Sequence, residues 1–263
     1  MKDYTDEYSA ELLQPIKRAE QREKIGLISS EYNFKGADIW RAYEFTWLNK
    51  RGKPEVGVLR FEIQATSLFF IESKSFKLYL GSFAGSIFSQ KELVLETLQK
   101  DLSANVGSQV LVDFLSPEDL FPRDIQDPNL VDLDKLDIDI SEYEYNPELL
   151  QGTGKKNVSE VISTNLFRSL CPMTAQPDFA SIIVEYRGAG IKHESLLSYL
   201  ISFRRHAAFS EQIVERVYFD LMKNFNFSAL CVSARYTRRG GLDINPHRFF
   251  NMQPPRHIRD SRQ

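Results

Sequence analysis

An internal repeat is the feature that most constrains this chain. The segment Tyr-Leu-Gly-Ser-Phe at 79–83 returns as Tyr-Leu-Ile-Ser-Phe at 199–203. Each copy opens a helical stretch with a similar ending: Glu96, Asp101 and Leu102 match Glu215, Asp220 and Leu221. Self-similarity on this scale indicates a duplicated supersecondary unit. We therefore interpret the chain as two copies of one module whose chemical residues have since diverged.

Both copies predict the same order of elements. In the first copy, partly alternating apolar residues at 55–71 predict a strand pair, and helices over 75–83 and 89–102 and a strand over 109–115 follow. In the second copy, we expect a strand at 180–186, helices at 194–205 and 210–224, a strand at 229–236 and an extended piece near Leu242. Ser89 is the N-cap candidate of the helix that it starts. Each module is thus predicted to be ββααββ, an antiparallel sheet with two helices in an α+β fold.

The predicted modules cover residues 1–145 and 146–263, with an acidic segment at 132–148 near the boundary. A charge-rich stretch of this kind is typical of a solvated connector. Its acidic residues alternate with Leu136, Ile138 and Ile140, which leaves an exposed edge strand open as a second interpretation.

Composition excludes several classes of protein. The formal net charge of −3 argues against a protein whose main task is to coat nucleic acid. Neither a signal peptide nor a run of eighteen apolar residues is present, so a cytoplasmic protein with no membrane partner is expected. The two cysteines, Cys171 and Cys231, are too few for a disulfide framework and lack the spacing of a zinc site.

The two cysteines occupy different settings. Cys171 begins a polar, proline-punctuated loop directly before a strand, where reactive groups are often placed, whereas Cys231 lies inside an apolar strand. A thiolate nucleophile needs partial exposure and a polarising neighbour, so Cys171 is the candidate and Cys231 is a structural residue. Asp178, in the same loop, is either a general acid or base or an aspartate that caps a turn.

Two further clusters favour anion binding. Glu-Ser-Lys-Ser-Phe-Lys-Leu-Tyr at 72–79 lies at a predicted strand-to-helix junction, where hydroxyl and ammonium groups suit an anionic ligand. The alternative is an ordinary helix start, with Ser73 as its cap and two solvated lysines. Arg-Tyr-Thr-Arg-Arg-Gly-Gly at 235–241 places guanidinium groups beside glycines, a combination that suits phosphate recognition.

Together these motifs closely resemble the 7-cyano-7-deazaguanine reductases of the queuosine pathway. The resemblance is carried by 72–79, by Cys-Pro at 171–172 with Gln-Pro-Asp at 176–178, and by Tyr-Thr-Arg-Arg-Gly-Gly at 236–241, and it covers nearly the whole chain. The chain is similar to the longer, two-module form of that family, whose modules are tunnelling folds related to GTP cyclohydrolase I. The internal repeat agrees with that form.

The resemblance implies an NADPH-dependent, four-electron reduction of the nitrile of 7-cyano-7-deazaguanine to 7-aminomethyl-7-deazaguanine, in tRNA queuosine biosynthesis. It implies that Cys171 attacks the nitrile carbon to form a covalent thioimide and that Asp178 supplies protons. Thiolate addition turns a poorly electrophilic nitrile into a C=N group that accepts hydride, which divides one hard step into easier ones. A homodimer is expected by resemblance, and no direct contact with nucleic acid.

The resemblance also implies the binding residues: Ile71, Glu72 and Ser73 contact the deazaguanine with Ser210 and Glu211, and NADPH is held by Ser73, Lys74, Arg239 and Gly240. A carboxylate such as Glu211 can accept a bidentate pair from the ring N–H and exocyclic amine of a guanine-like edge. No Gly-x-Gly-x-x-Gly fingerprint occurs, so the cofactor is expected to be held outside a Rossmann fold. Because the proposed substrate residues come from both halves, the site is expected to use both modules.

One residue departs from the family pattern. Where that pattern has His-Glu, this chain has Ser210-Glu211, and serine cannot carry a proton reversibly near neutral pH. His206 lies one helical turn earlier and is the candidate replacement. Two alternatives therefore stay open: a deazaguanine-binding protein with impaired catalysis, and a zinc-dependent pterin-type cyclohydrolase on the same fold.

Overall fold

The structure, a computed structural model, describes residues 4–27, 33–120, 130–255 and 259–263. The chain forms two compact units, each assembled from three segments. The first unit contains the described residues of 1–24, 37–121 and 238–244, and the second contains those of 25–36, 122–237 and 245–263. The predicted boundary after residue 145 concerns the copies of the repeat rather than these units, and it stays a prediction.

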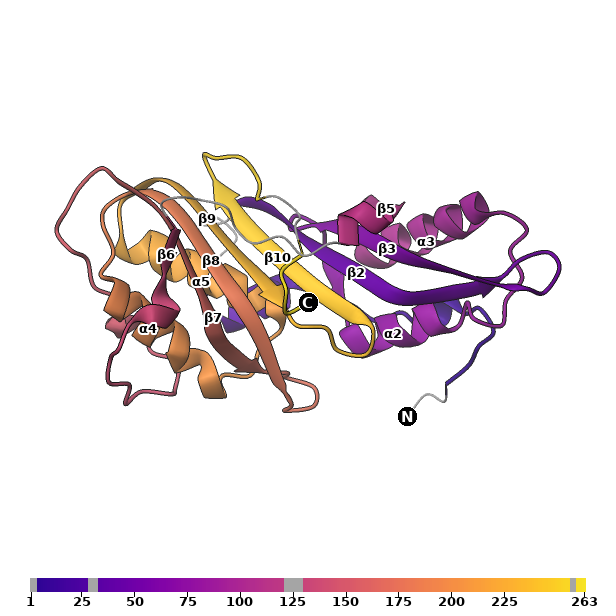
Figure 1. The fold of residues 1–263 in the computed structure, drawn as a ribbon, viewed down its shortest axis with the longest axis horizontal. Coiled ribbons are helices and arrows are strands. Elements are labelled where there is room, and N and C mark those ends of the chain that lie inside the picture. The colour runs from indigo at the N-terminus through magenta and orange to yellow at the C-terminus, as the bar shows by residue number, and fades with distance from the viewer. Residues whose placement is uncertain (1–3, 28–32, 121–129, 256–258) are drawn as a thin grey trace. The chain divides into compact units, whose positions relative to one another are not determined.

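The first unit is built on the antiparallel strands β2 (Lys35–Leu48), β3 (Pro54–Gln64) and β5 (Val110–Phe114), in the order β5-β3-β2. Helices α2 (Ser73–Gly81) and α3 (Lys91–Val106) follow β3, and α3 packs on β5 (Figure 1). A small separate sheet pairs β1 (Pro15–Lys17) with β4 (Phe69–Ile71), next to α1 (Arg18–Lys24). Apolar side chains of the α3 face, such as Val94, Leu98 and Leu102, are fully buried and form the core of this unit.

The second unit repeats this plan with more strands. Its order is β10-β9-β8-β7-β6, formed by β6 (Leu130–Asp132), β7 (Val158–Leu170), β8 (Pro177–Gly188), β9 (Phe227–Tyr236) and β10 (Leu242–Phe250). Helices α4 (His193–Ser202) and α5 (Ser210–Asn224) lie between β8 and β9 in the chain, and α5 packs on β9 while α4 contacts β7 (Figure 1). All pairs are antiparallel except β6 with β7.

The repeat in the sequence is also a repeat of hydrogen bonds. In each copy one aspartate of the second helix accepts hydrogen bonds from two tyrosine hydroxyls at 2.6–2.8 Å: Asp101 from Tyr8 and Tyr79, Asp220 from Tyr145 and Tyr199. The serine that ends the first helix, Ser82 or Ser202, donates its hydroxyl to the carbonyl of that helical tyrosine at 2.7 Å. Burial and then the aspartate raise the pKa of Tyr79 and Tyr199, so both stay hydrogen-bond donors. These side chains join the two helices of each copy.

Most predicted elements are confirmed as helices or strands, but the first copy differs in its pairing. Strands β3 and β4 both form within 55–71, yet they do not pair with each other, because β3 lies between β2 and β5 and β4 pairs with β1. After α3, the described chain adds only β5 to the first unit, whereas β6 pairs with β7. The full ββααββ order is therefore seen in the second copy, and the first copy has one strand fewer after its helices among described residues.

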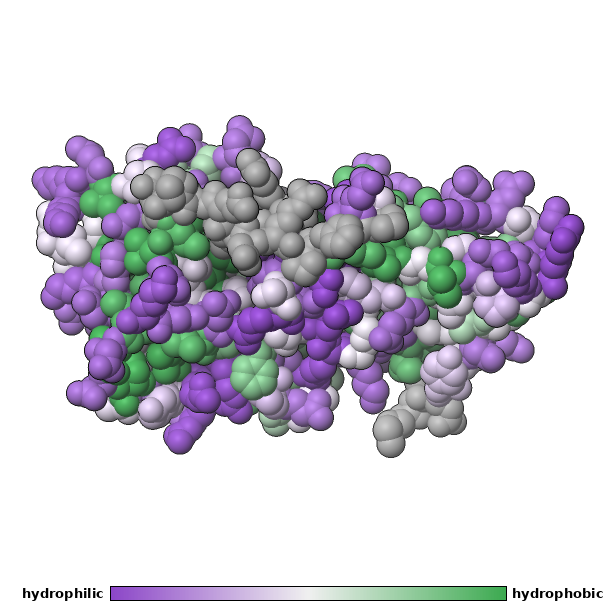
Figure 2. All heavy atoms as spheres, in the orientation of Figure 1, coloured by the Kyte–Doolittle hydropathy of each residue, from purple (hydrophilic) through white to green (hydrophobic). Residues whose placement is uncertain are grey.

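The acidic segment follows the connector interpretation, because Leu136, Ile138 and Ile140, whose alternation left an edge strand open, lie in irregular structure. It begins at the end of β6, which is the edge strand of its sheet, and most of the rest has no regular structure. Asp134 anchors this segment, because its carboxylate accepts hydrogen bonds from the Thr164 hydroxyl at 2.6 Å and from the backbone of Asn165. None of the helices in the described ranges combines the length and apolar character that crossing a membrane requires. The face drawn in Figure 2 is mainly hydrophilic, with hydrophobic residues in separate patches.

Candidate active site

Cys171 lies at the start of the tight loop that joins β7 to β8. Its N–H donates to the carbonyl of Gln176 at 2.8 Å, and its carbonyl accepts from the N–H of Ala175 at 2.9 Å. Ala175 closes the turn with a φ of 54°, a left-handed conformation that costs a non-glycine residue energy. The loop therefore fixes the backbone of Cys171 on both sides, and the residue is only 7% exposed.

The loop also changes the acidity of the thiol. Burial raises the pKa of Cys171, and the charge of Asp178 acts in the same direction. Hydrogen bonds to the sulfur from the Thr174 hydroxyl and from the backbone N–H groups of Met173 and Thr174 outweigh both effects, so the pKa is lowered from its ordinary value. A larger share of Cys171 is thus thiolate near neutral pH, which is the form that acts as a nucleophile.

Asp178 is held close to this thiol by the register of the hairpin. It lies on β8 opposite Ser169 of β7, one position inside the pair Leu170 and Pro177. The residue is half-buried, and its charge affects both Cys171 and Tyr236. The structure therefore brings together the two predicted catalytic residues in one unit.

Helix α5 is brought to the same place by a short stretch of backbone pairing. Leu170, directly before the cysteine, donates its N–H to the carbonyl of His206 at 2.9 Å and accepts from the N–H of Ala208 at 3.1 Å. The helix begins two residues later with Ser210 and Glu211 in its first turn, and Glu211 is 3% exposed. A carboxylate at this position is favoured by the unpaired N–H groups and dipole of the helix N-terminus.

Tyr236 links these residues, and sequence reasoning missed it. It is 3% exposed at the end of β9, and burial, then the charges of Asp178 and Glu211, raise its pKa. The hydroxyls of Ser169 and Ser210 lie close enough to lower that pKa partly. The Tyr236 hydroxyl nevertheless has no partner at full hydrogen-bonding geometry in the described chain, which leaves it able to donate to a ligand. The residue belonged to a quoted motif, but only the fold shows which side chains it meets.

The predicted residues of the first unit lie around the start of α2. The N-cap of this helix is Glu72 and not Ser73 as predicted: its carboxylate accepts from the N–H of Lys74 at 2.9 Å and from the N–H of Ser75 at 2.7 Å. Glu72 is buried, with 7% exposure, so its carboxylate is kept close to these two N–H groups at the helix start. Ile71 is buried in β4, Ser73 is half-buried and Lys74 is exposed.

The basic turn after β9 lies near the same helix. Arg239 donates its N–H to the carbonyl of Leu242 at 2.9 Å, and the two intervening glycines have φ values of 60° and 76°. A Cβ at Gly240 would meet the side chain of Lys77 of α2 at 3.1 Å, so this turn and α2 are in contact. Arg238 stacks over the Tyr43 ring at 4.5 Å. The turn thus brings Arg238, Arg239 and Gly240 beside Lys77 of α2, a set of cations and backbone groups that suits a phosphate.

Two other sequence predictions have clear outcomes. His206 does not share a helix with Ser210, because it follows a short 3-10 helix and α5 begins only at 210. Its ring packs against Tyr145 and Phe203 at 5.4 and 5.6 Å, and burial lowers its pKa. Cys231 is confirmed as a buried residue of β9, and burial followed by the charge of Glu185 raises its pKa to about 12.

Neither a group of metal ligands nor either of two pockets coincides with these positions in the described ranges. Within the described ranges, His, Cys, Asp and Glu form no group of three or more that could hold a metal ion. Two pockets of the described chain, at the β2–β3 hairpin and at the end of β10, are lined by other residues.

The site combines an activated thiol with a neighbouring carboxylate and a second, buried carboxylate. This combination is typical of an enzyme that acts on a small polar substrate through a cysteine.

Two family models match the chain. One is described as the N-terminal part of the nitrile reductase 7-cyano-7-deazaguanine reductase and matches residues 4–114, and the other is described as a QueF-like protein and matches 177–253. The chain is 46% identical over 262 residues to the NADPH-dependent 7-cyano-7-deazaguanine reductase of Burkholderia lata and 47% identical to those of Burkholderia ambifaria and Burkholderia multivorans. These alignments cover 99% of this chain and 95% of each relative. The chain belongs to the family of NADPH-dependent 7-cyano-7-deazaguanine reductases.

Proposed function

We propose that this chain reduces the nitrile of 7-cyano-7-deazaguanine to the aminomethyl group, in tRNA queuosine biosynthesis. One nitrile, two NADPH and two protons give one primary amine and two NADP⁺, so four electrons are transferred. Family membership supports the oxidoreductase class and NADPH as the cofactor. The observation that carries the proposal to this chain is the Cys171 thiol with its lowered pKa beside Asp178.

The first step of the proposed mechanism needs only residues of the second unit. The Cys171 thiolate attacks the nitrile carbon, a C–S bond forms, and the electron pair displaced to nitrogen takes a proton from Asp178, acting as general acid. The product is a covalent thioimide. Hydrogen bonds from Thr174 and the loop N–H groups keep the thiolate populated for this attack. When bound, NADPH supplies the hydrides that this C=N carbon accepts.

Recognition of the base is assigned to carboxylates. Glu211 accepts from the ring N–H and the exocyclic amine of the deazaguanine, and its burial at a helix start makes the loss of either donor costly. Ser210 and the Tyr236 hydroxyl lie beside Glu211 and complete this polar patch. Ile71, Glu72 and Ser73 are the substrate contacts proposed from the first unit. The Glu72 carboxylate, already bonded to two backbone N–H groups, is held rigidly for such a contact.

Cofactor binding is assigned to Ser73, Lys74, Arg239 and Gly240. The missing Cβ at Gly240 lets the backbone approach a phosphate, while Lys74 and Arg239 supply charge. We further propose that the two copies are tandem tunnelling-fold modules, 1–145 and 146–263, in a cytoplasmic homodimer that does not itself bind nucleic acid. The repeated tyrosine–aspartate clusters support the duplication.

A second candidate function follows from Ser210. The first turn of α5 offers a serine hydroxyl next to Tyr236, where the family pattern has an imidazole, and His206 is held in an aromatic cluster instead. A protein of this kind would bind the deazaguanine with Glu211 and turn it over slowly. Tight nitrile binding without NADPH oxidation is the result that would favour it.

The covalent adduct tests the proposed chemistry. Intact-mass spectrometry of the protein with the nitrile and without NADPH should show one added substrate mass on the wild type and on Cys231→Ala. Cys171→Ala should show none. An adduct that persists on Cys171→Ala would rule out Cys171 as the nucleophile.

A further inference from the structure

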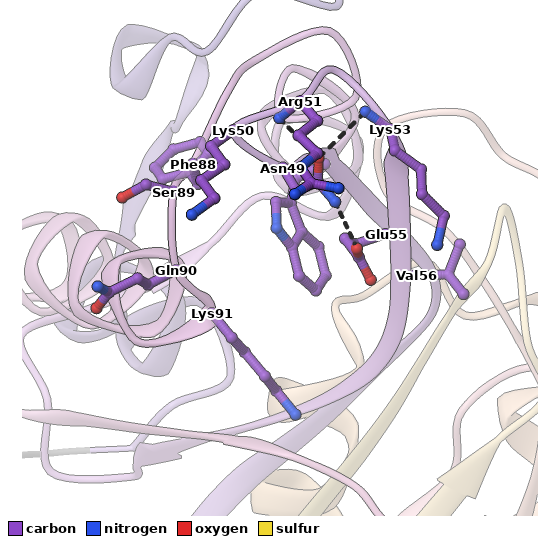
Figure 3. A pocket seen from close by; sticks show the side chains of 11 residues that line it. Asn49, Lys50, Arg51, Lys53, Glu55, Val56, Phe88, Ser89, Gln90 and Lys91 are labelled. Atoms are coloured by element: carbon purple, nitrogen blue, oxygen red, sulfur yellow. Dashed lines mark hydrogen bonds between the residues drawn. The ribbon is translucent and has the colours of Figure 1, made fainter.

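A pocket of about 590 Å³ lies in the first unit, far along the chain from the proposed catalytic residues. It is formed by the turn between β2 and β3 and by the start of α3, whose lining side chains are drawn in Figure 3. Its charged lining consists of Lys50, Arg51, Lys53 and Lys91 and the single carboxylate of Glu55.

The backbone around this pocket matches the backbone around Cys171. Asn49 donates its N–H to the carbonyl of Lys53 at 2.9 Å, as Cys171 does to Gln176 at 2.8 Å. Leu48 donates to the carbonyl of Ser86 at 3.0 Å and accepts from Phe88 at 2.8 Å, as Leu170 does with His206 and Ala208. The hairpin register agrees as well, since Trp47 opposes Glu55 as Ser169 opposes Asp178.

These matches give each proposed catalytic residue a counterpart. Asn49 corresponds to Cys171 and Glu55 to Asp178, while Gln90 and Lys91, at the start of α3, correspond to Ser210 and Glu211. An amide replaces the thiol, so this pocket cannot form the cysteine adduct. The base-binding carboxylate is replaced by an ammonium, so it cannot pair with the N–H edge of a guanine-like base.

The charge of the pocket is inverted rather than lost. Four cations face one carboxylate, and within the described chain none of the four forms an ion pair. The Glu55 carboxylate accepts from the side chain of Asn49 at 2.8 Å, and Lys91 lies 3.9 Å over the Phe114 ring. The N-cap residue Gln90 makes no side-chain cap hydrogen bond, so the first N–H groups of α3 add to the positive potential.

We propose that the first copy keeps this pocket as a non-catalytic binding site for a small phosphorylated ligand, a nucleoside phosphate. Phosphate oxygens match the four cations, and Trp47 and Phe88 supply an apolar wall for a base. The volume is within the roughly 300–1,000 Å³ that ligand pockets occupy, which exceeds what one free phosphate needs. Backbone geometry and charge define this site, so it does not depend on the nitrile chemistry.

Isothermal titration of the full chain with pyrophosphate, guanosine 5′-monophosphate and uncharged guanosine tests the site. The two anions should bind, and guanosine should bind at least about tenfold more weakly than the monophosphate, because charged hydrogen bonds carry the affinity. Lys91→Glu should weaken both anions by about tenfold or more, and Lys100→Glu, which makes the same change of charge at an exposed position later in α3, should change them less than about twofold. Arg51→Gln, in the exposed turn, repeats the test at a position where folding is not at stake.

Three results would overturn the proposal: no binding of either anion at millimolar concentration, equal effects of Lys91→Glu and Lys100→Glu, or loss of binding in Arg239→Gln alone, which would place the anion at the cofactor residues. NADPH oxidation with the nitrile, measured on the same variants, should be unchanged in Lys91→Glu. A failure of the reductase assay in the wild type would count against the proposed function. The titrations would still test the anion site, because they do not depend on reductase activity.

Discussion

The two copies of the repeat share a scaffold and differ in the side chains at one place. In both copies an aspartate accepts from two tyrosines, and in both a hairpin loop is joined to the start of the second helix by the same backbone bonds. The side chains at the loop differ, with Asn49 in the first copy and Cys171 in the second. The comparison teaches that backbone pairing and buried polar clusters preserve the fold, while a few side chains at the end of a strand decide what the site does.

The largest expected difference between the copies is in catalysis. Cys171→Ala should lower the rate of nitrile-dependent NADPH oxidation by about 10³-fold or more, because it removes the nucleophile. Asn49→Ala, the matched change in the first copy, should leave the rate unchanged. Steady-state absorbance of NADPH measures both, and equal losses would show that the copies had been assigned the wrong roles.

Ser210→His restores the residue of the family pattern and should increase the difference in proton transfer between the two copies. If proton transfer limits turnover, an imidazole at the start of α5 should raise kcat by about 10²-fold and add an ionisation near neutral pH to the rate profile. Gln90→His in the first copy should alter neither. An unchanged rate and pH profile in Ser210→His would show that proton transfer at this position does not limit turnover.

The pKa values of the two cysteines are shifted in opposite directions, so the two thiols should react differently at a given pH. Hydrogen bonds lower the pKa of Cys171, so its alkylation by iodoacetamide should persist below the ordinary thiol range and fall as the pH drops through the lowered pKa. Burial raises the pKa of Cys231 to about 12, so it should stay unlabelled near neutral pH. Thr174→Val removes a hydrogen bond that lowers the pKa of Cys171, so it should slow labelling of Cys171 at pH 7 by about tenfold. Peptide mapping of the label against pH decides, and faster labelling in Thr174→Val would contradict the account.

The smallest effect is expected at the caps of the first helices. The Glu72 carboxylate accepts two backbone N–H bonds at the start of α2, whereas its counterpart at the start of α4, Lys192, makes no side-chain cap bond. Glu72→Ala should therefore lower the free energy of unfolding by about 1 kcal/mol, and Lys192→Ala should change it by less than about 0.5 kcal/mol. Thermal unfolding of both variants measures the difference, and matching losses would remove the structural role given to Glu72.

Much of the fold could be predicted because each local sequence pattern occurs twice, once in each copy of the repeat. Helix α5 begins and ends where predicted, at 210 and 224, since its apolar face and polar start agree. Strands β2 and β7 were missed, because the continuous buried run 37–42 of β2 and the bulges at Ala42/Phe45 and Thr164/Phe167 break the alternation that marks a strand. The N-cap Glu72 was misassigned to Ser73, because glutamate is rarely favoured at that position and only tertiary packing holds it there.

Site residues that belong to a short sequence motif could be predicted. Contacts between residues on strands far apart in the sequence could not. Cys171 and Asp178 are close in sequence, and the hairpin register brings them together. Tyr236 meets Ser210 and Asp178 only because β9 pairs with β8, a contact that no local pattern encodes. The cationic pocket at Lys91 could be recognised as the counterpart of the Cys171 site only from backbone hydrogen bonds that align the two copies.

The most direct test of the account counts cofactor against substrate. The purified chain is given a known, limiting amount of 7-cyano-7-deazaguanine with excess NADPH, and the oxidation is followed to completion beside a sample of Cys171→Ala. We predict oxidation that depends on the nitrile, stops at two NADPH per nitrile, and is absent in the variant. Tight binding of the nitrile with NADPH left unchanged would contradict the account, and would leave the second copy as a base-binding site without the chemistry that distinguishes it from the first.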